Sequence, residues 1–350
     1  MSPFVIRPRF WLVLFDRLQM PSIKLQDSIT TDVVDQLEVK SVFFEQFLIQ
    51  NSRTGTDLGD ALGGRECCEA FLRQLTLHGR TFLQLQITAD SEKDIAPRVD
   101  ESRLFPGQSP LQTLLLTSTS IEALSLEDRN TLADTDVLLI TIATQSHSAD
   151  TAAIADHGLA LIQKLASHLF HDGEDPTLLV TALRGTPCPA PPSLEFGIDE
   201  GLVRVPAWYR NPQTGAGRVQ TICGSYDLLP SILGWIKTVS SDSAAASALS
   251  AEQSSDVCFQ GTLPLFTDLP GAEDSERMLR LQGDGWTALR TQQYLLVTHD
   301  NSGHDAYAPE DPLRQLYLKP DDYWNVNDVI VSYGEIASLM LQAEAESFPL

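Results

Sequence analysis

The chain has 350 residues, of which 43% are hydrophobic, so it can bury a sizeable core and global disorder is excluded. Its 24 basic and 47 acidic residues give a formal net charge of -23, which disfavours binding to nucleic acids and to anionic membrane surfaces. The five cysteines contain no C-x-x-C pair, a pattern typical of reduced thiols. We therefore expect a cytoplasmic protein that binds neither nucleic acid nor membrane.

The first part of the chain alternates apolar runs with helical patterns. Residues 10–15 (FWLVLF) are uninterruptedly apolar, as in a central parallel strand, and are too few for a membrane span or a leader. Residues 32–39 have helical spacing, and residues 41–49 are typical of a strand or of a strand followed by a helix start. A helix over 67–77, a stop at His78-Gly79 and a strand over 81–87 complete the crossover pattern of a parallel sheet.

This alternation continues to residue 237, with predicted strands over 137–143, 177–181, 202–209 and 219–223 and predicted helices over 151–170 and from Asp227 to Ile236. Residues 238–256 are almost all Ser, Ala and acid and predict a flexible linker. Beyond it, hairpin turns such as the one around Gly283-Asp284-Gly285 join strands near 278–282, 286–290 and 293–298, before a helix over 333–346. We predict an α/β domain over 1–237, a linker over 238–256 and a small antiparallel subdomain over 257–350.

Five segments, in order, resemble landmarks of the sulfatases, especially of divergent bacterial sulfatase-like proteins. They are residues 11–17 (WLVLFDR), 31–47 (TDVVDQLEVKSVFFEQF), 175–186 (DPTLLVTALRGT), 203–233, and 286–298 together with 316–329. The resemblance implies an alkaline-phosphatase-like α/β/α sandwich around a mostly parallel sheet, followed by a small antiparallel α+β subdomain. The chain is shorter than a full sulfatase, with residues 90–136 condensed and residues 187–200 short and rich in proline.

The resemblance also implies where a metal site should lie. In the family, a calcium or magnesium ion is held by two carboxylates after the first strand and by an Asp and an Asn or His after a late strand. Here Asp16 is followed by Arg17, and Leu183 and Arg184 occupy the two late positions. An arginine does not give up its proton to become a ligand. Asp16 is therefore the only surviving candidate ligand, and we expect neither a metal nor another cofactor.

The family's nucleophile is a formylglycine made from the Cys or Ser of a C-x-P-S-R or S-x-P-S-R motif. Ser52 and Arg53 match the end of that motif, which places Ile49 at the nucleophile position, so we expect no catalytic residue. Adjacent Cys67 and Cys68 lack the motif and are interpreted as buried thiols of a helix. His168 and His171 are spaced for one helical face but are interpreted as solvated surface histidines.

Three hypotheses follow. The first is a degenerate, catalytically inactive sulfatase-like pseudoenzyme, in which Asp16 pairs with Arg17 or Arg184 because a buried lone carboxylate is costly. In its sharper form, Arg17, Arg53 and Arg184 still receive a sulfate- or phosphate-like anion. The alternative is an active sulfuric or phosphoric ester hydrolase of the same family with altered site residues. The third is an interaction module whose acidic surface or linker binds a protein partner that the sequence does not identify.

Overall fold

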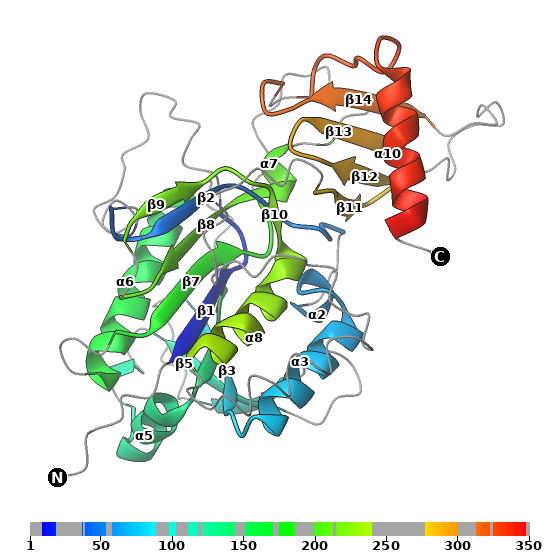
Figure 1. Ribbon diagram of the computed structural model, residues 1–350. Helices are drawn as coiled ribbons and strands as arrows, with labels where there is room; N and C mark the ends of the chain where they lie inside the picture. Colours follow the sequence, from blue (N-terminus) through cyan, green and yellow to red (C-terminus); the bar gives the residue numbers. More distant parts are fainter. Residues whose placement is uncertain are drawn as a thin grey trace.

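A large sheet and a small sheet organise the chain (Figure 1). The computed structural model describes residues 9–18, 37, 39–53, 58–88, 98–102, 111–117, 121–122, 124–143, 151–170, 175–185, 198, 200–212, 215–239, 277–299, 313–322 and 325–347. The remaining residues, including 240–276 with most of the predicted linker, lie outside this description.

Within the described residues, the large sheet has ten strands in the order β10-β2-β8-β7-β1-β6-β3-β5-β4, with β9 also paired to β2. β8 runs antiparallel to β2 and β7, and β4 runs antiparallel to β5; the other pairs are parallel. The predicted, mostly parallel sheet is therefore confirmed. The strands are β1 Phe10–Phe15, β2 Val42–Leu48, β3 Phe82–Thr88, β4 Arg98–Ser102, β5 Leu111–Thr117, β6 Val137–Ala143, β7 Thr177–Ala182, β8 Arg204–Arg210, β9 Gly217–Val219 and β10 Cys223–Gly224.

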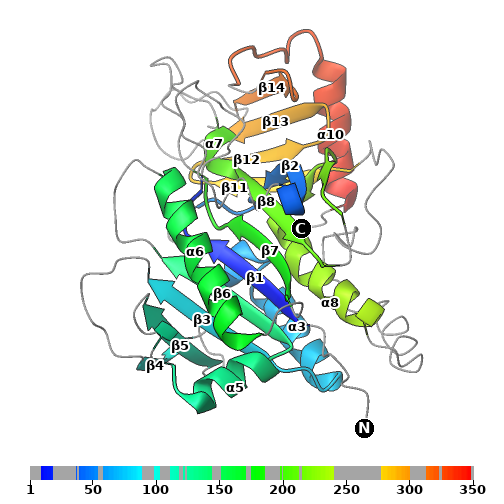
Figure 2. The same ribbon diagram turned by 90° about the vertical axis from the view of Figure 1, so that its left-hand side faces the viewer.

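Helices cover both faces of this sheet, so the α/β/α sandwich is confirmed. Figure 2 shows α6 (Thr151–Leu169) across one face, with α3 (Arg65–Leu77) and α8 (Leu228–Val239) behind the opposite face. The short helix α2 (Leu58–Ala61) precedes α3, and α5 (Leu126–Asp134) packs beside α6. Every residue of β1 is buried, as its unbroken apolar run predicts. Helix α6 lies so close to β1 that a Cβ at Gly158 would come within 2.4 Å of the Phe15 ring.

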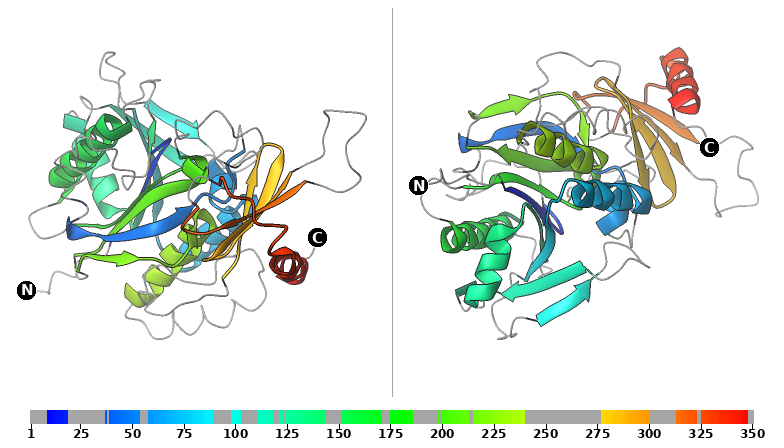
Figure 3. Two further views of the ribbon diagram at one scale, coloured as in Figure 1. Left: turned by 90° about the horizontal axis from the view of Figure 1, so that it is seen from above. Right: turned by 60° about the horizontal axis from the view of Figure 1, so that its bottom comes forward.

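The small sheet contains β11 (Leu279–Gly283), β12 (Trp286–Arg290), β13 (Tyr294–His299) and β14 (Arg314–Leu318), all antiparallel. Gly285 has a φ of 77° in the turn between β11 and β12, a conformation that favours glycine. One face of the sheet packs on α10 (Gly334–Ser347), which Figure 3 shows on the side away from the large sheet. The other face packs on residues of the large domain, including Leu48 and Val203.

Some predicted elements differ from the observed ones. A strand was predicted over 202–209, but its first two residues belong to the short helix α7 (Glu200–Val203), and the strand β8 begins only at Arg204. The predicted start of this strand was therefore wrong. The strand predicted over 219–223 is also wrong, because β9 ends at Val219 and β10 starts at Cys223. The condensed stretch 90–136 contains β4, β5 and α5, which the sequence did not indicate. The predicted helix over 32–39 and its N-cap lie mostly outside the described residues.

Candidate functional site

The carboxyl ends of β1 and β7 bring together the residues that the sequence placed in the vestigial metal site. The strands are adjacent and parallel, with Phe15 opposite Ala182. Beyond them, the Leu183 amide donates to the Phe15 carbonyl at 2.8 Å, and the Leu18 amide donates to the Arg184 carbonyl at 3.1 Å. Asp16 and Arg17 therefore lie beside Leu183 and Arg184 at the same edge of the sheet.

Asp16 does not form the ion pair that the sequence suggested. Its side chain is exposed, and so is that of Arg17. Among the described residues, no ion pair joins Asp16 to Arg17 or to Arg184. The prediction was wrong because it assumed a buried carboxylate, whereas a solvated carboxylate needs no cation to offset its desolvation.

The segment after β2 occupies a different part of the same edge. β2 and β1 are separated by β8 and β7, so three strand spacings place their ends about 14 Å apart. Ile49, at the presumed nucleophile position, is only 1% exposed and donates its amide to the Val203 carbonyl at 2.7 Å. Ser52 donates both its amide (2.9 Å) and its hydroxyl (3.1 Å) to the Gln282 carbonyl of β11.

Gln50 is a buried connector in this segment that the sequence did not reveal. Its side-chain oxygen accepts the Tyr226 amide at 3.1 Å, and its backbone amide donates to the Ser225 hydroxyl at 3.2 Å. A Cβ at Gly224 would lie 2.2 Å from the same side-chain oxygen, so a larger residue there would displace the Gln50 side chain from these hydrogen bonds. The side-chain amide of Gln50 also donates to the carbonyl of Arg280, at 3.4 Å. These partners lie 175 or more residues away, and local periodicity carries no signal for them.

Two buried ion pairs attach the small sheet nearby. Lys319 Nζ lies 2.8 Å from a carboxylate oxygen of Glu200 on α7, and both side chains are at most 4% exposed. Arg277, before β11, donates to both carboxylate oxygens of Asp227, again with both side chains at most 4% exposed. Burial lowers the pKa of Lys319, and the Glu200 carboxylate opposes this shift. Sequence reasoning missed both pairs, because their members are far apart along the chain.

Gly185, which follows Arg184, is covered by α7. The Gly185 amide donates to the Leu202 carbonyl at 3.0 Å, and a Cβ at Gly185 would lie 1.7 Å from the Gly201 carbonyl oxygen. Only a residue without a side chain allows this contact between two backbones. The carboxyl end of β7 is therefore partly covered by α7.

The residues at this edge do not fit the divalent ion that the sulfatase resemblance implies. Such an ion needs several oxygen ligands, mostly carboxylates. Leu183 offers no ligand atom, and the Arg184 guanidinium repels a cation. In the part of the chain that the structure describes, no group of three or more His, Cys, Asp or Glu side chains is placed to hold a metal. His168 is exposed on α6, and its predicted neighbour His171 lies outside the described residues.

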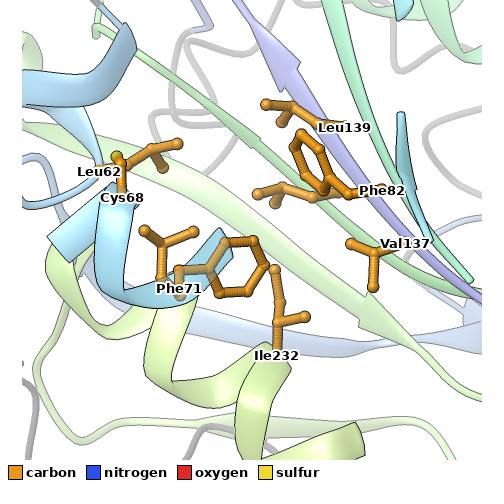
Figure 4. Close-up of a pocket in the computed structure, with 9 residues that line it drawn as sticks. Leu62, Cys68, Phe71, Phe82, Val137, Leu139 and Ile232 are labelled. Atoms are coloured by element: carbon orange, nitrogen blue, oxygen red, sulfur yellow. The ribbon is translucent and has the colours of Figure 1, made fainter. Parts of the chain in front are cut away.

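The buried cysteines and cavities lie elsewhere. Cys67 and Cys68 are buried thiols of α3, as predicted, and Cys68 lines an apolar cavity between β1, β6, α3 and α8. Figure 4 shows the side chains of Phe71, Phe82 and Ile232 converging on this cavity. Burial raises the pKa of the Cys223 thiol to about 12, so this thiol is protonated at neutral pH. Within the described residues, no helix is both long and apolar enough to cross a membrane.

Comparisons with known proteins give a clear result at the level of structure. No family model matches the sequence, and no curated protein matches it. The structure of Ps i-CgsB in complex with k-i-k-neocarrahexaose matches with a TM-score of 0.63 at 12% identity, covering 98% of this chain and 93% of that one. A protein in the alkaline phosphatase superfamily from Vibrio parahaemolyticus matches with a TM-score of 0.57 at 11% identity, covering 95% and 88%. BT1596, a 2-O GAG sulfatase, matches with a TM-score of 0.57 at 10% identity, covering 98% and 93%. Over nearly its full length, the chain has the fold of the sulfatases of the alkaline phosphatase superfamily.

Proposed function

We propose that this chain is a catalytically inactive, sulfatase-like protein that has kept the fold and lost the metal ligands and the nucleophile. One observation carries the proposal: Leu183 and Arg184 lie beside Asp16 at the ends of β7 and β1, where the resemblance implies anionic and neutral metal ligands. Metal-ion catalysis needs a cation to polarise the ester and stabilise the nucleophile. A leucine and two arginines in place of ligands, next to a single exposed aspartate, oppose the binding of that cation.

The test compares the wild-type protein with a variant that rebuilds the expected ligands, Arg17→Asp/Leu183→Asp/Arg184→Asn. Calcium and magnesium are titrated into both proteins by calorimetry, and hydrolysis of an aryl sulfate and an aryl phosphate is followed with each metal and with a chelator. We expect no heat and no turnover for the wild type, and metal binding only for the rebuilt variant. Metal-dependent turnover by the wild type would instead establish the alternative, an active ester hydrolase with altered site residues.

Anion binding at the same edge is a second candidate, favoured by Arg17 and Arg184. These arginines end neighbouring parallel strands, and no ion pair with another described residue involves either of them. Guanidinium groups bind sulfate and phosphate through paired hydrogen bonds. Calorimetric titration with sulfate and with sulfated sugars tests this role, with Arg17→Gln/Arg184→Gln as the control. The absence of heat at millimolar ligand would end the idea.

A further inference from the structure

We infer that the segment from Ile49 to Ser52 is a structural link that fixes the small sheet on the end of β2 and closes this end to ligands. The inference goes beyond the proposed function, and rests on it only in taking Ile49 as the former nucleophile position. A protein can lose catalytic activity while its substrate pocket stays open. Here the contacts of the segment indicate that other parts of the chain fill the space around Ile49.

The first observation is that the backbone of the segment joins the two sheets. The Gln282 amide donates to the Gln50 carbonyl at 2.8 Å, and the Ser52 amide donates back to the Gln282 carbonyl at 2.9 Å. Asn51 and Gln282 thereby form a parallel bridge between the extension of β2 and β11. The hydrogen bonding of the large sheet therefore continues into the small one through these residues.

The second observation is that Gln50 in the segment, and Leu48 just before it, are buried against distant parts of the chain. Gln50 is 3% exposed, and its side chain bonds to the backbones of Tyr226 and Arg280. Leu48 is 1% exposed and belongs to an apolar cluster shared with the inner face of the small sheet. A ligand that reached Ile49 would have to break these hydrogen bonds and expose this cluster to water.

The third observation is that two buried ion pairs also attach the small sheet to the rest of the chain. Asp227, next to Tyr226, pairs with Arg277, and Glu200 on α7 pairs with Lys319. Separation of the two sheets would leave these charges without partners during the movement. The small sheet is therefore not a lid that opens by itself, and the end of β2 opens only when the link unfolds.

The first test measures amide hydrogen exchange in the wild-type protein. We expect the amides of Ile49, Gln50, Ser52 and Gln282 to exchange only as fast as those in the middle of β2, because both require the same opening. Exchange of these amides at the rate of an exposed loop, while β2 stays protected, would overturn the inference. This readout does not depend on any activity of the protein.

The second test measures access to the former nucleophile position directly. Ile49→Cys is compared with Arg53→Cys, an exposed position directly after the segment, and labelling by a small thiol reagent is resolved by peptide mass spectrometry. We expect Cys at position 49 to react at least about a thousandfold more slowly than at position 53 in the folded protein, and equally fast after unfolding. Gln50→Ala should raise the rate at position 49, whereas Gln342→Ala, on the exposed face of α10, should not. Equal rates at positions 49 and 53 in the folded protein would refute the closure.

The proposed loss of catalysis and the proposed structural link can each be refuted without the other. Turnover of an aryl sulfate by a wild-type protein whose Ile49 amide is protected would refute the proposed loss of catalysis and leave the link intact. Rapid labelling at position 49 in a protein that neither binds metal nor turns over would refute the link and leave the loss of catalysis intact.

Discussion

Replacing Lys319 by methionine should be among the most destabilising single changes in the small subdomain. The ammonium group has three N–H donors, and three acceptors surround it: a Glu200 carboxylate oxygen, the Asp322 carbonyl and the Asn325 side-chain oxygen. The Lys319 side chain is 0% exposed and that of Glu200 is 4% exposed, so water replaces neither partner. Lys319→Met therefore removes the ion-pair partner of the buried Glu200 carboxylate, which keeps only a longer-range electrostatic interaction with Arg290.

The expected cost is about 3–5 kcal/mol of unfolding free energy, which is typical when one partner of a buried ion pair is removed. Urea denaturation measures it as a lower midpoint with an unchanged slope. The control is Arg65→Ala, which removes an exposed pair with Glu69 within α3 (side chains 58% and 43% exposed) and should cost at most about 0.5 kcal/mol.

A second variant separates the loss of a charge pair from the loss of packing. Adding Glu200→Leu to Lys319→Met removes the orphaned carboxylate and should restore part of the lost stability, because apolar replacement of a whole buried pair is often neutral. A cost below about 1 kcal/mol for Lys319→Met, or no recovery in the double variant, would refute the view that this pair holds the small sheet on α7.

Two further changes test the contacts around the candidate site. Gly185→Ala should lower the unfolding free energy by about 3 kcal/mol or more, since its Cβ would meet the Gly201 carbonyl oxygen at 1.7 Å, whereas Gly215→Ala, which has nothing within 4 Å, should be nearly neutral in the same melt. Burial raises the pKa of Tyr226 from 10.0 to about 12, so the folded state holds this proton longer than the unfolded chain does. The free energy of unfolding should therefore fall as pH rises from about 10 to 12, and Tyr226→Phe should make this fall less steep. The same pH dependence in both proteins would show that water reaches the phenol in the folded state.

Much of the fold could be predicted because its signals are local. The apolar runs of β1, β6 and β7 and the Asp284-Gly285 turn are contiguous in sequence. β4 (RVDES) escaped prediction because it carries no apolar run, whereas β5 (LQTLLLT) has a leucine run as long as the apolar run of β7 and was overlooked. Leu202 and Val203 of α7 were predicted as the start of a strand, because the contacts that hold this helix, of Glu200 with Lys319 and of Gly201 with Gly185, come from distant parts of the chain.

The candidate site could be predicted in part, because some of its residues follow strands that local apolar runs reveal. Parallel strands end at the same edge, so the alignment of Asp16 and Arg17 with Leu183 and Arg184 followed from the motifs once β1 and β7 were identified as strands. The sequence did not show whether Asp16 is buried. The predicted ion pair was wrong because Asp16 is exposed. Gln50 gave no signal, because all of its partners come from residues beyond 220.

Under the proposed function, the two ends of the candidate site differ in how readily substitutions could rebuild catalytic residues. At the end of β1, Asp16 and Arg17 are exposed, so substitutions there meet water and cost little folding energy, whereas Leu183 at the end of β7 is partly buried against the core. At β2, Ile49 is buried and hydrogen-bonded to Val203, and its neighbours join the two sheets. We expect carboxylates introduced at the first end to bind a metal ion, and a cysteine at position 49 to remain a buried thiol out of reach of a substrate. Under the proposed function, the second end therefore makes the loss of catalysis hard to reverse by point substitution.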